Sequence, residues 1–359
     1  MIHKNFQEIS LPVLGMGAMR IKTGDSDREE MQELLDYAFE NGINYFDTAF
    51  AYGDSEKTLG ELLVKYPRQD YYLATKYLIH SGGDYKSVFE EQLNRLKTDY
   101  IDFYMIHSVA DNTYQRYIDN GCIEYFSGLK QKGCIRYFGF SSHASIEILK
   151  NLAGYRSWDF AMIQLNCYDW LYGLAKQEYE VLEKLNIPII AMEPIRGGRL
   201  AALSPKAEAV LRDAHPDWSI ASWFFRWLKR LPGIQMVLSG VETLEYLKEN
   251  NILFSSTEDI SLNDAEEKLL FEACEIFREE VTVLCTSCNY CINECPASID
   301  ISKIIELYNF MKTDKHWDLK KIEGIDSKGK PADCTSCGIC LSRCPQKINI
   351  TDIMKELNG

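Results

Sequence analysis

Eight of the 12 cysteines are crowded into one stretch of this 359-residue chain. Three thiolates spaced closely on one loop can hold three corners of a cubane iron–sulfur cluster, whereas a fourth, set off by a longer spacer and a proline, points away. The chain contains this C-x2-C-x2-C-x3-C-P arrangement twice. The first run is Cys285, Cys288, Cys291, Cys295 and Pro296, and the second is Cys334, Cys337, Cys340, Cys344 and Pro345.

Zinc and disulfides are the competing explanations for clustered cysteines. Zinc sites pair two C-x2-C knuckles and do not require a third cysteine at the same step or a repeated Cys-Pro ending. Disulfides fit poorly, because the N-terminal segment MIHKNFQEIS lacks the apolar run of a secretion signal and cytosolic thiols stay reduced. The spacing therefore favours iron–sulfur over zinc.

The duplicated run resembles that of the bacterial ferredoxins, in which the fourth cysteine of each run binds the cluster of the other run. The resemblance implies two [4Fe-4S] clusters. One would be held by Cys285, Cys288, Cys291 and Cys344, and the other by Cys334, Cys337, Cys340 and Cys295. Residues 297–333 separate the runs, and Ile301–Lys312 has helical periodicity. The module is therefore more similar to the helical two-cluster ferredoxins of dehydrogenase subunits than to the compact ones.

A second set of reactive side chains follows three apolar segments in the first third of the chain. Asp47 and Tyr52 come after the first of these segments, Lys76 ends the next, and His107 ends the third. Each residue alone has an ordinary explanation, such as a helix cap, a core tyrosine or a solvated loop residue. Their joint placement at the ends of successive strands predicts a site, because barrel enzymes keep their chemistry at that end.

The elements that would position these residues alternate between short apolar runs and longer segments of helical period. Eight strand candidates are Val13–Met16, Tyr45–Asp47, Tyr72–Thr75, Phe103–Ile106, Tyr137–Phe140, Ala161–Leu165, Pro188–Met192 and Gln235–Leu238. Eight such units predict an α/β fold, a (β/α)8 TIM barrel. An open doubly wound sheet is the alternative, but Gly15-Met16-Gly17 is too short for its glycine-rich phosphate turn. We place the barrel at residues 1–280, ending in a helix over Ser261–Val281. We place a small, mainly helical, ferredoxin-like domain at residues 281–359.

The motifs F-D-T-A-x-x-Y-G, A-T-K and D-x-x-x-x-H resemble those of the aldo-keto reductases and occur in the order of that family. The resemblance covers about the first 260 residues and implies a catalytic tetrad of Asp47, Tyr52, Lys76 and His107. Tyr52 would donate a proton to a carbonyl oxygen during hydride delivery from a nicotinamide cofactor. Lys76, held by Asp47, would lower the pKa of Tyr52 by favouring the phenolate. His107 would orient and polarise the carbonyl group.

The same resemblance implies where the cofactor binds. Residues expected to contact the nicotinamide are Ser141, Ser142, Gln164 and Met192. Arg196 is expected at the pyrophosphate, and Gly240, Glu249 and Asn250 at the adenosine end. Ser142 stands where the family usually has asparagine, and Met192 where many members have a stacking aromatic residue. Gly240 and Tyr246 stand where NADP-preferring members carry a cation, which favours NAD(H) and keeps NADP(H) as the alternative.

The formal net charge of −14 excludes nucleic acid as an expected partner, because an acidic surface repels phosphates. No apolar stretch reaches the ~20 residues of a membrane helix, so we expect a cytoplasmic protein with no membrane partner. The expected substrate is a small carbonyl compound or alcohol, and a ferredoxin or another electron-transfer protein is a further possible partner. Because a cluster passes one electron and a hydride carries two, a flavin such as FMN is an alternative cofactor. Besides a nicotinamide-dependent and a flavin-dependent reductase, a third hypothesis is a redox-sensing protein that binds a cofactor with little turnover. The complete tetrad argues against it.

Overall fold

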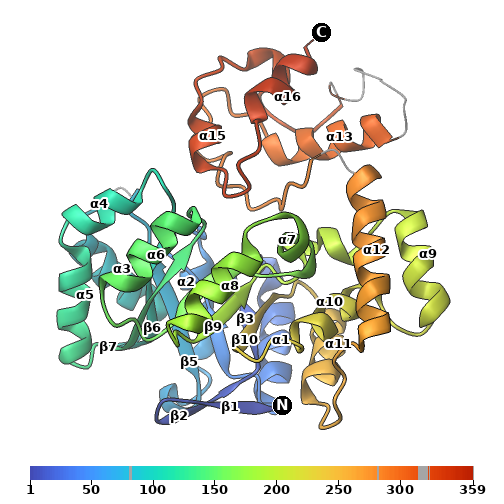
Figure 1. Cartoon of the computed structure of the whole chain (residues 1–359). Helices are drawn as coiled ribbons and strands as arrows, with labels where there is room; N and C mark the ends of the chain where they lie inside the picture. Colours follow the sequence, from blue (N-terminus) through green and yellow to red (C-terminus); the bar gives the residue numbers. More distant parts are fainter. Residues whose placement is uncertain (81–82, 281–282, 314–321, 323, 359) are drawn as a thin grey trace. The chain divides into compact units, whose positions relative to one another are not determined.

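A computed structural model describes residues 1–80, 83–280, 283–313, 322 and 324–358. The chain divides into two compact units (Figure 1). The first consists of residues 1–194 and 222–263, and the second of residues 195–221 and 264–359. The boundary near residue 280 therefore stays a prediction, and each unit is described by itself below.

The first unit is a closed barrel of eight parallel strands, which confirms the predicted fold class. In the order of their pairing the strands are β10 (Ile234–Gly240), β3 (Leu14–Gly17), β4 (Tyr45–Asp47), β5 (Tyr72–Tyr77), β6 (Ile101–Val109), β7 (Ile135–Ser142), β8 (Ala161–Gln164) and β9 (Ile189–Met192), after which β9 pairs with β10. All eight predicted strands are present. Because every pair is parallel, the carboxyl ends of the strands meet at one mouth of the barrel.

Helices and short 3-10 turns alternate with these strands and lie outside them (Figure 1). They are η1 (Asp25–Asp27), α1 (Arg28–Glu40), α2 (Ser55–Leu63), η2 (Arg68–Asp70), α3 (Tyr85–Leu96), α4 (Tyr114–Asp119), α5 (Cys122–Gln131), α6 (Ile146–Tyr155), α7 (Cys167–Tyr172), α8 (Ala175–Lys184), α10 (Ile220–Leu228) and α11 (Leu244–Ser255).

The barrel interior is filled by large side chains that alternate along the strands, so it is a core and not a channel. Tyr45, Phe103 and Tyr137 are buried there, in one cluster with Phe6 and Leu11. Phe6 and Leu11 belong to an antiparallel hairpin of β1 (His3–Phe6) and β2 (Ile9–Pro12), which the sequence did not predict. The hairpin thus adds apolar side chains to the core at the amino ends of the strands, opposite the candidate catalytic residues.

The second unit is mainly helical. It contains η3 (Arg196–Ala201), α9 (Pro205–Ala214), α12 (Asp264–Glu280), α13 (Ile301–Thr313), η4 (Pro331–Asp333), α15 (Ile339–Arg343) and α16 (Ile350–Glu356). Helix α12 lies against α9, and α13 was predicted over Ile301–Lys312. Apolar residues of α13 and α16, such as Ile304 and Met354, share a buried cluster with Cys285 and Cys291. The cysteine runs are thus built into a hydrophobic core.

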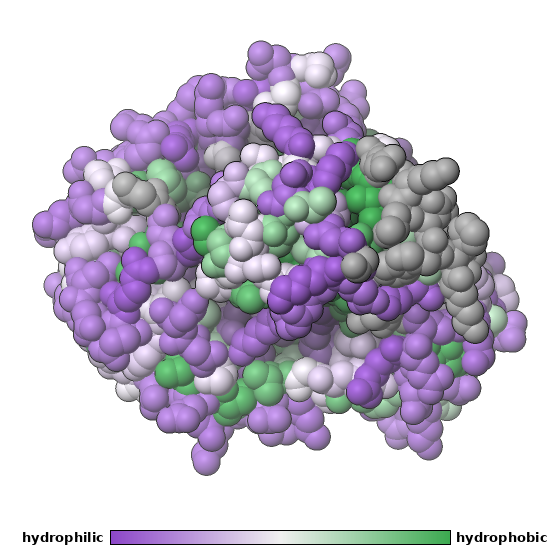
Figure 2. All heavy atoms as spheres, turned by 90° about the horizontal axis from the view of Figure 1, so that it is seen from above, coloured by the Kyte–Doolittle hydropathy of each residue, from purple (hydrophilic) through white to green (hydrophobic). Residues whose placement is uncertain are grey.

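The face of the molecule seen in Figure 2 is covered largely by hydrophilic residues, with smaller hydrophobic areas between them. Such a surface is ordinary for a globular protein, as is the content of charged residues, 26% of the chain. In the described part of the chain, no helix has the length and apolar character required to cross a bilayer.

Candidate active site and cluster module

An ion pair is buried at the mouth of the barrel. Asp47 is the last residue of β4, and Lys76 lies on the neighbouring strand β5. The Lys76 Nζ donates to Asp47 Oδ1 at 2.5 Å and to the Thr48 carbonyl oxygen at 2.7 Å. Burial lowers the pKa of Lys76 and raises that of Asp47, and the attraction between their charges opposes both shifts. The pair therefore places a lysine ammonium group at a site from which water is excluded.

Tyr52 and His107 lie beside this ion pair. Tyr52 is in the loop between β4 and α2, and the Lys76 Nζ lies 5.0 Å from the centroid of its ring. The rings of Tyr52 and His107 meet edge to face, with centroids 5.6 Å apart. The structure thus brings all four predicted tetrad residues together, although they come from three different strand ends and one loop.

His107 is buried within β6, which decides its protonation. Burial lowers the pKa of His107 well below its usual value, and the nearby positive charges of Lys76 and His143 lower it further. The imidazole is therefore neutral near pH 7. A neutral ring can donate one hydrogen bond to an oxygen atom in the site.

A network of buried polar side chains lies behind Lys76. Glu56 on α2 accepts hydrogen bonds from the Thr75 hydroxyl at 2.6 Å and from Gln92 Nε2 at 2.9 Å. Gln92 also donates to the carbonyl oxygen of Lys76 at 3.1 Å. These bonds fix the backbone of β5 on both sides of the lysine. Glu56 and Gln92 were not singled out from the sequence, since a glutamate and a glutamine at helical positions resemble ordinary surface residues.

Most residues predicted to bind the cofactor lie at the carboxyl ends of the last four barrel strands. Ser141 and Ser142 end β7, Gln164 ends β8 opposite Met192 at the end of β9, and Gly240 ends β10. Ser141 Oγ accepts a hydrogen bond from the Ser108 backbone N–H at 2.7 Å, and Gln164 Nε2 donates to Asp169 Oδ2 at 2.6 Å. Glu249 and Asn250 lie on α11, where Asn250 Nδ2 donates to Ser239 Oγ at 2.9 Å. Asp169, which holds Gln164 in place, was missed by the sequence analysis.

Arg196 is the one predicted cofactor residue that belongs to the second unit. Its Nη2 donates to Gln346 Oε1 at 2.6 Å and to the Leu284 carbonyl oxygen at 3.1 Å. Both partners lie within two residues of a cysteine of the paired runs. Contact of Arg196 with a pyrophosphate stays a prediction.

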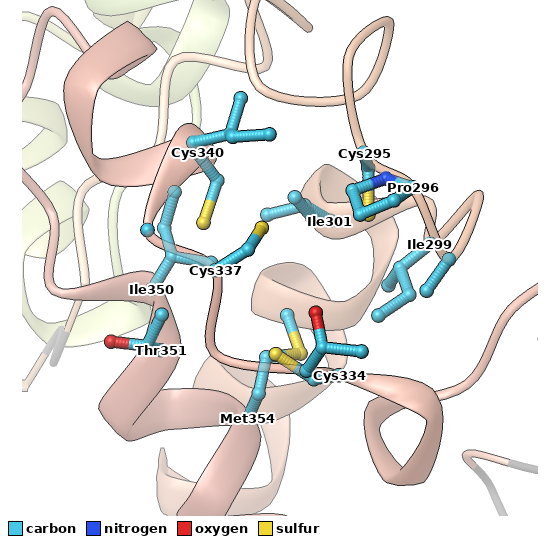
Figure 3. A pocket seen from close by; sticks show the side chains of 14 residues that line it. Cys295, Pro296, Ile299, Ile301, Cys334, Cys337, Cys340, Ile350, Thr351 and Met354 are labelled. Atoms are coloured by element: carbon cyan, nitrogen blue, oxygen red, sulfur yellow. The ribbon is translucent and has the colours of Figure 1, made fainter.

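The cysteines of the second unit form two groups. Cys295, Cys334, Cys337 and Cys340 line a pocket with about 380 Å³ of empty space, part of it open to solvent (Figure 3). Its four thiols are those predicted for one cluster, with Cys295 contributed by the other run.

Cys291 marks the second group. Burial raises the pKa of Cys291, and its neighbours Cys288, Cys344 and Cys285 raise it further. These four cysteines are the set predicted for the other cluster, with Cys344 again coming from the opposite run. Thiols in such surroundings deprotonate readily only when a cation compensates the charge, as the iron atoms of a cluster would.

Comparison with known proteins identifies both parts of the chain. The aldo/keto reductase family model matches residues 13–266. The chain belongs to the aldo-keto reductase family. The model of the 4Fe-4S dicluster domain matches residues 284–348, so this aldo-keto reductase carries an iron–sulfur domain after its barrel.

Related proteins and structures match the barrel of this aldo-keto reductase. It is 29% identical over 280 residues to the Uncharacterized oxidoreductase YqkF of Bacillus subtilis, covering 68% of this chain and 87% of that protein. It is 26% identical over 279 residues to the Methylglyoxal reductase YeaE of Escherichia coli, covering 74% and 92%. The holo form of aldo-keto reductase AKR11C1 from Bacillus halodurans superposes with a TM-score of 0.63 at 25% identity, covering 76% of this chain and 96% of the other.

Proposed function

We propose that the barrel reduces a small carbonyl compound, or oxidises the corresponding alcohol, with a nicotinamide cofactor and with Tyr52 as the proton donor. The observation that carries the proposal is the buried Lys76 ammonium group, 5.0 Å from the Tyr52 ring and paired with Asp47. When the Tyr52 O–H gives its proton to the carbonyl oxygen, a phenolate remains. A fixed cation nearby stabilises that negative charge.

The residues at the strand ends fit a nicotinamide cofactor in their chemistry. Hydroxyl and amide side chains at Ser141, Ser142, Gln164 and Asn250 suit the hydrogen-bonding groups of a carboxamide and an adenine. Gly240 presents bare backbone, since a Cβ there would find only the Gly17 carbonyl oxygen, at 3.9 Å. When bound, the cofactor supplies the two electrons of the reduction as hydride. The neutral His107 ring would orient the carbonyl group toward it.

NAD(H) is the cofactor that we propose. The 2′-phosphate of NADP(H) needs a cation, and the segment after β10 instead carries Glu242 in the turn and Glu245 in the first turn of α11. Binding constants for NADH and NADPH, measured by fluorescence on one preparation, test this preference. Tighter binding of NADPH would overturn it.

The cysteines of the second unit are proposed to hold two [4Fe-4S] clusters with crossed ligands. Cys285, Cys288, Cys291 and Cys344 would bind cluster 1, and Cys334, Cys337, Cys340 and Cys295 would bind cluster 2. The support is the pocket lined by one set and the grouping of the other around Cys291. The clusters would exchange single electrons with a ferredoxin or another electron-transfer partner.

The decisive experiment compares the wild type with Tyr52→Phe in anaerobically purified, full-length protein. With NADH and a panel of aldehydes and ketones that includes methylglyoxal, kcat should fall by about 10²–10⁴-fold in the variant, since one acid–base group is lost. Nucleotide affinity and iron content should not change. Tyr155→Phe removes a hydroxyl group from an exposed tyrosine of α6 and serves as the control. Full activity of Tyr52→Phe would refute the assignment.

A flavin-dependent reductase on the same barrel is the second candidate. The presence of a 4Fe-4S dicluster domain favours it, because a flavin converts between single-electron and two-electron transfer and nicotinamide does so poorly. Acid extraction of the anaerobic protein tests it. Yellow FMN released in proportion to the protein would favour this candidate, whereas flavin-free protein that oxidises NADH with carbonyl compounds would exclude it.

A further inference from the structure

The loop after β9 folds with the cysteine runs. Residues 195–221 belong to the same compact unit as residues 264–359. Within that unit Arg196 is only 5% exposed, and its Nη2 contacts both Gln346 Oε1 and the Leu284 carbonyl oxygen. Arg199, from the next turn of the same loop, donates from Nε to the Cys285 carbonyl oxygen at 3.2 Å.

These contacts converge on one cluster. Cys285 is the first cysteine of the cluster 1 ligand set, and Leu284 directly precedes it. Gln346 lies two residues after Cys344, the last cysteine of that set. One loop therefore contacts both the segment that begins with Cys285 and the segment that follows Cys344. Arg196 itself lies in the left-handed region, with φ +45°, which is unfavourable for a residue with a Cβ, and Gly197 and Gly198 follow it with positive φ.

Cluster 2 has different surroundings. All 14 residues that line its pocket are uncharged, and Cys337 is exposed. Arg343, next to Cys344, pairs with Glu294, so these two charges offset each other. In the described part of this unit, the two guanidinium groups of the loop are thus directed to the cluster 1 segments, and no charged side chain lines the cluster 2 pocket.

We propose that Arg196 and Arg199 are positioning residues that hold the segments carrying the cluster 1 ligands and raise the reduction potential of cluster 1. The inference rests on the ligand sets proposed above and not on the reductase chemistry of the barrel. Reduction adds one electron, and hence one negative charge, to a cluster. A guanidinium group stays charged at every accessible pH, and a buried positive charge stabilises the reduced form.

The test is a reductive titration of full-length, anaerobically purified protein with dithionite, followed by electron paramagnetic resonance. In Arg196→Gln and Arg199→Gln one of the two potentials should become more negative, by an amount equal to about a tenfold change in the reduction equilibrium, or about 59 mV for one electron. The other potential should not move. Cys337→Ser identifies the potential that belongs to cluster 2, since that signal should be the one it removes.

Three controls separate this role from a general structural one. Arg212→Gln removes an exposed arginine of α9 in the same unit, and neither potential should change. Arg196→Lys keeps the charge and should shift the potential less than Arg196→Gln. Iron analysis shows whether both clusters are assembled. If Arg196→Gln loses cluster 1 alone, the positioning role is supported. If it loses both clusters, the test passes to the reduction potentials of Arg199→Gln, which removes a single hydrogen bond. The proposal would be overturned if neither potential changed in Arg196→Gln and Arg199→Gln with both clusters assembled. Equal shifts of both potentials, or the same shift in Arg212→Gln, would also overturn it.

Discussion

Replacing Asp47 by asparagine should destabilise the barrel, because it removes the direct ion-pair partner of the buried Lys76 ammonium group. At the observed 2.5 Å and an effective dielectric constant of about 20, the direct attraction is on the order of 7 kcal/mol, much of it offset by the loss of hydration. Removal of one partner from a buried pair costs about 3–5 kcal/mol. For a barrel of this size that cost lowers Tm by on the order of 10 °C.

The assay is thermal unfolding of the full chain, followed by far-ultraviolet circular dichroism. The control is Glu30→Gln, which breaks the exposed Lys22–Glu30 pair at 2.6 Å and should cost under about 1 kcal/mol. In the double variant Asp47→Asn with Lys76→Met the unpaired charge is gone, so part of the lost stability should return. The reasoning from a buried ion pair would be refuted if Asp47→Asn had the same Tm as Glu30→Gln. It would also be refuted if the double variant were no more stable than Asp47→Asn.

Three further predictions concern the histidine, the cysteines and the helix packing. The pKa of His107 in the folded protein lies below its unfolded value of 6.5, so on acidification the unfolded chain takes up a proton first. Below pH 6.5, Tm should therefore fall more steeply in the wild type than in His107→Gln. Parallel curves of Tm against pH for the two proteins would contradict this. Cys337→Ser should halve the iron content. The control is Cys274→Ser, which changes a buried cysteine outside the two runs and should leave the iron content unchanged. Equal iron contents in the two variants would show that Cys337 is not a cluster ligand. Gly60→Ala would place a Cβ 2.0 Å from the Arg95 carbonyl oxygen and should cost about 1–3 kcal/mol, whereas Gly128→Ala, with open space around it in α5, should stabilise by about 0.5–1 kcal/mol in urea unfolding.

The barrel strands were predictable because strands buried on both faces read as continuous apolar runs. The location of a candidate site followed from them, since parallel strands bring their carboxyl ends together, whereas the four tetrad residues were implied by the resemblance to the aldo-keto reductases. The β1–β2 hairpin was missed because its two strands have only four residues each, and two such strands gain stability only by placing Phe6 and Leu11 against the barrel core. Helix α9 had a signal that was not used, because Ser204 caps it and Pro205 begins it.

The two cysteine groups were predictable for a different reason. Spacing within one run indicates a local loop, and the resemblance of the repeated run to the bacterial ferredoxins implies that the fourth cysteine of each run joins the other group. The partners of Arg196 had no such signal, since Leu284 and Gln346 lie 88 and 150 positions away in the chain. A resemblance at the loop after β9 predicted a phosphate contact for Arg196, and only the fold shows that its guanidinium group contacts the cluster segments.

The residues just before this loop belong to the barrel unit and are held by hydrogen bonds of their own. Three residues before Arg196, Glu193 has φ +51°, and its carbonyl oxygen accepts a hydrogen bond from Asn166 Nδ2 at 3.1 Å. Asn166 and Gln164 both donate to the same oxygen of Asp169, at 2.6 Å each. Asp169 therefore holds both Gln164, at the proposed nicotinamide site, and Asn166, which in turn binds the backbone of Glu193. These bonds all lie within the barrel unit, so they can position Gln164 without any contribution from the iron–sulfur module.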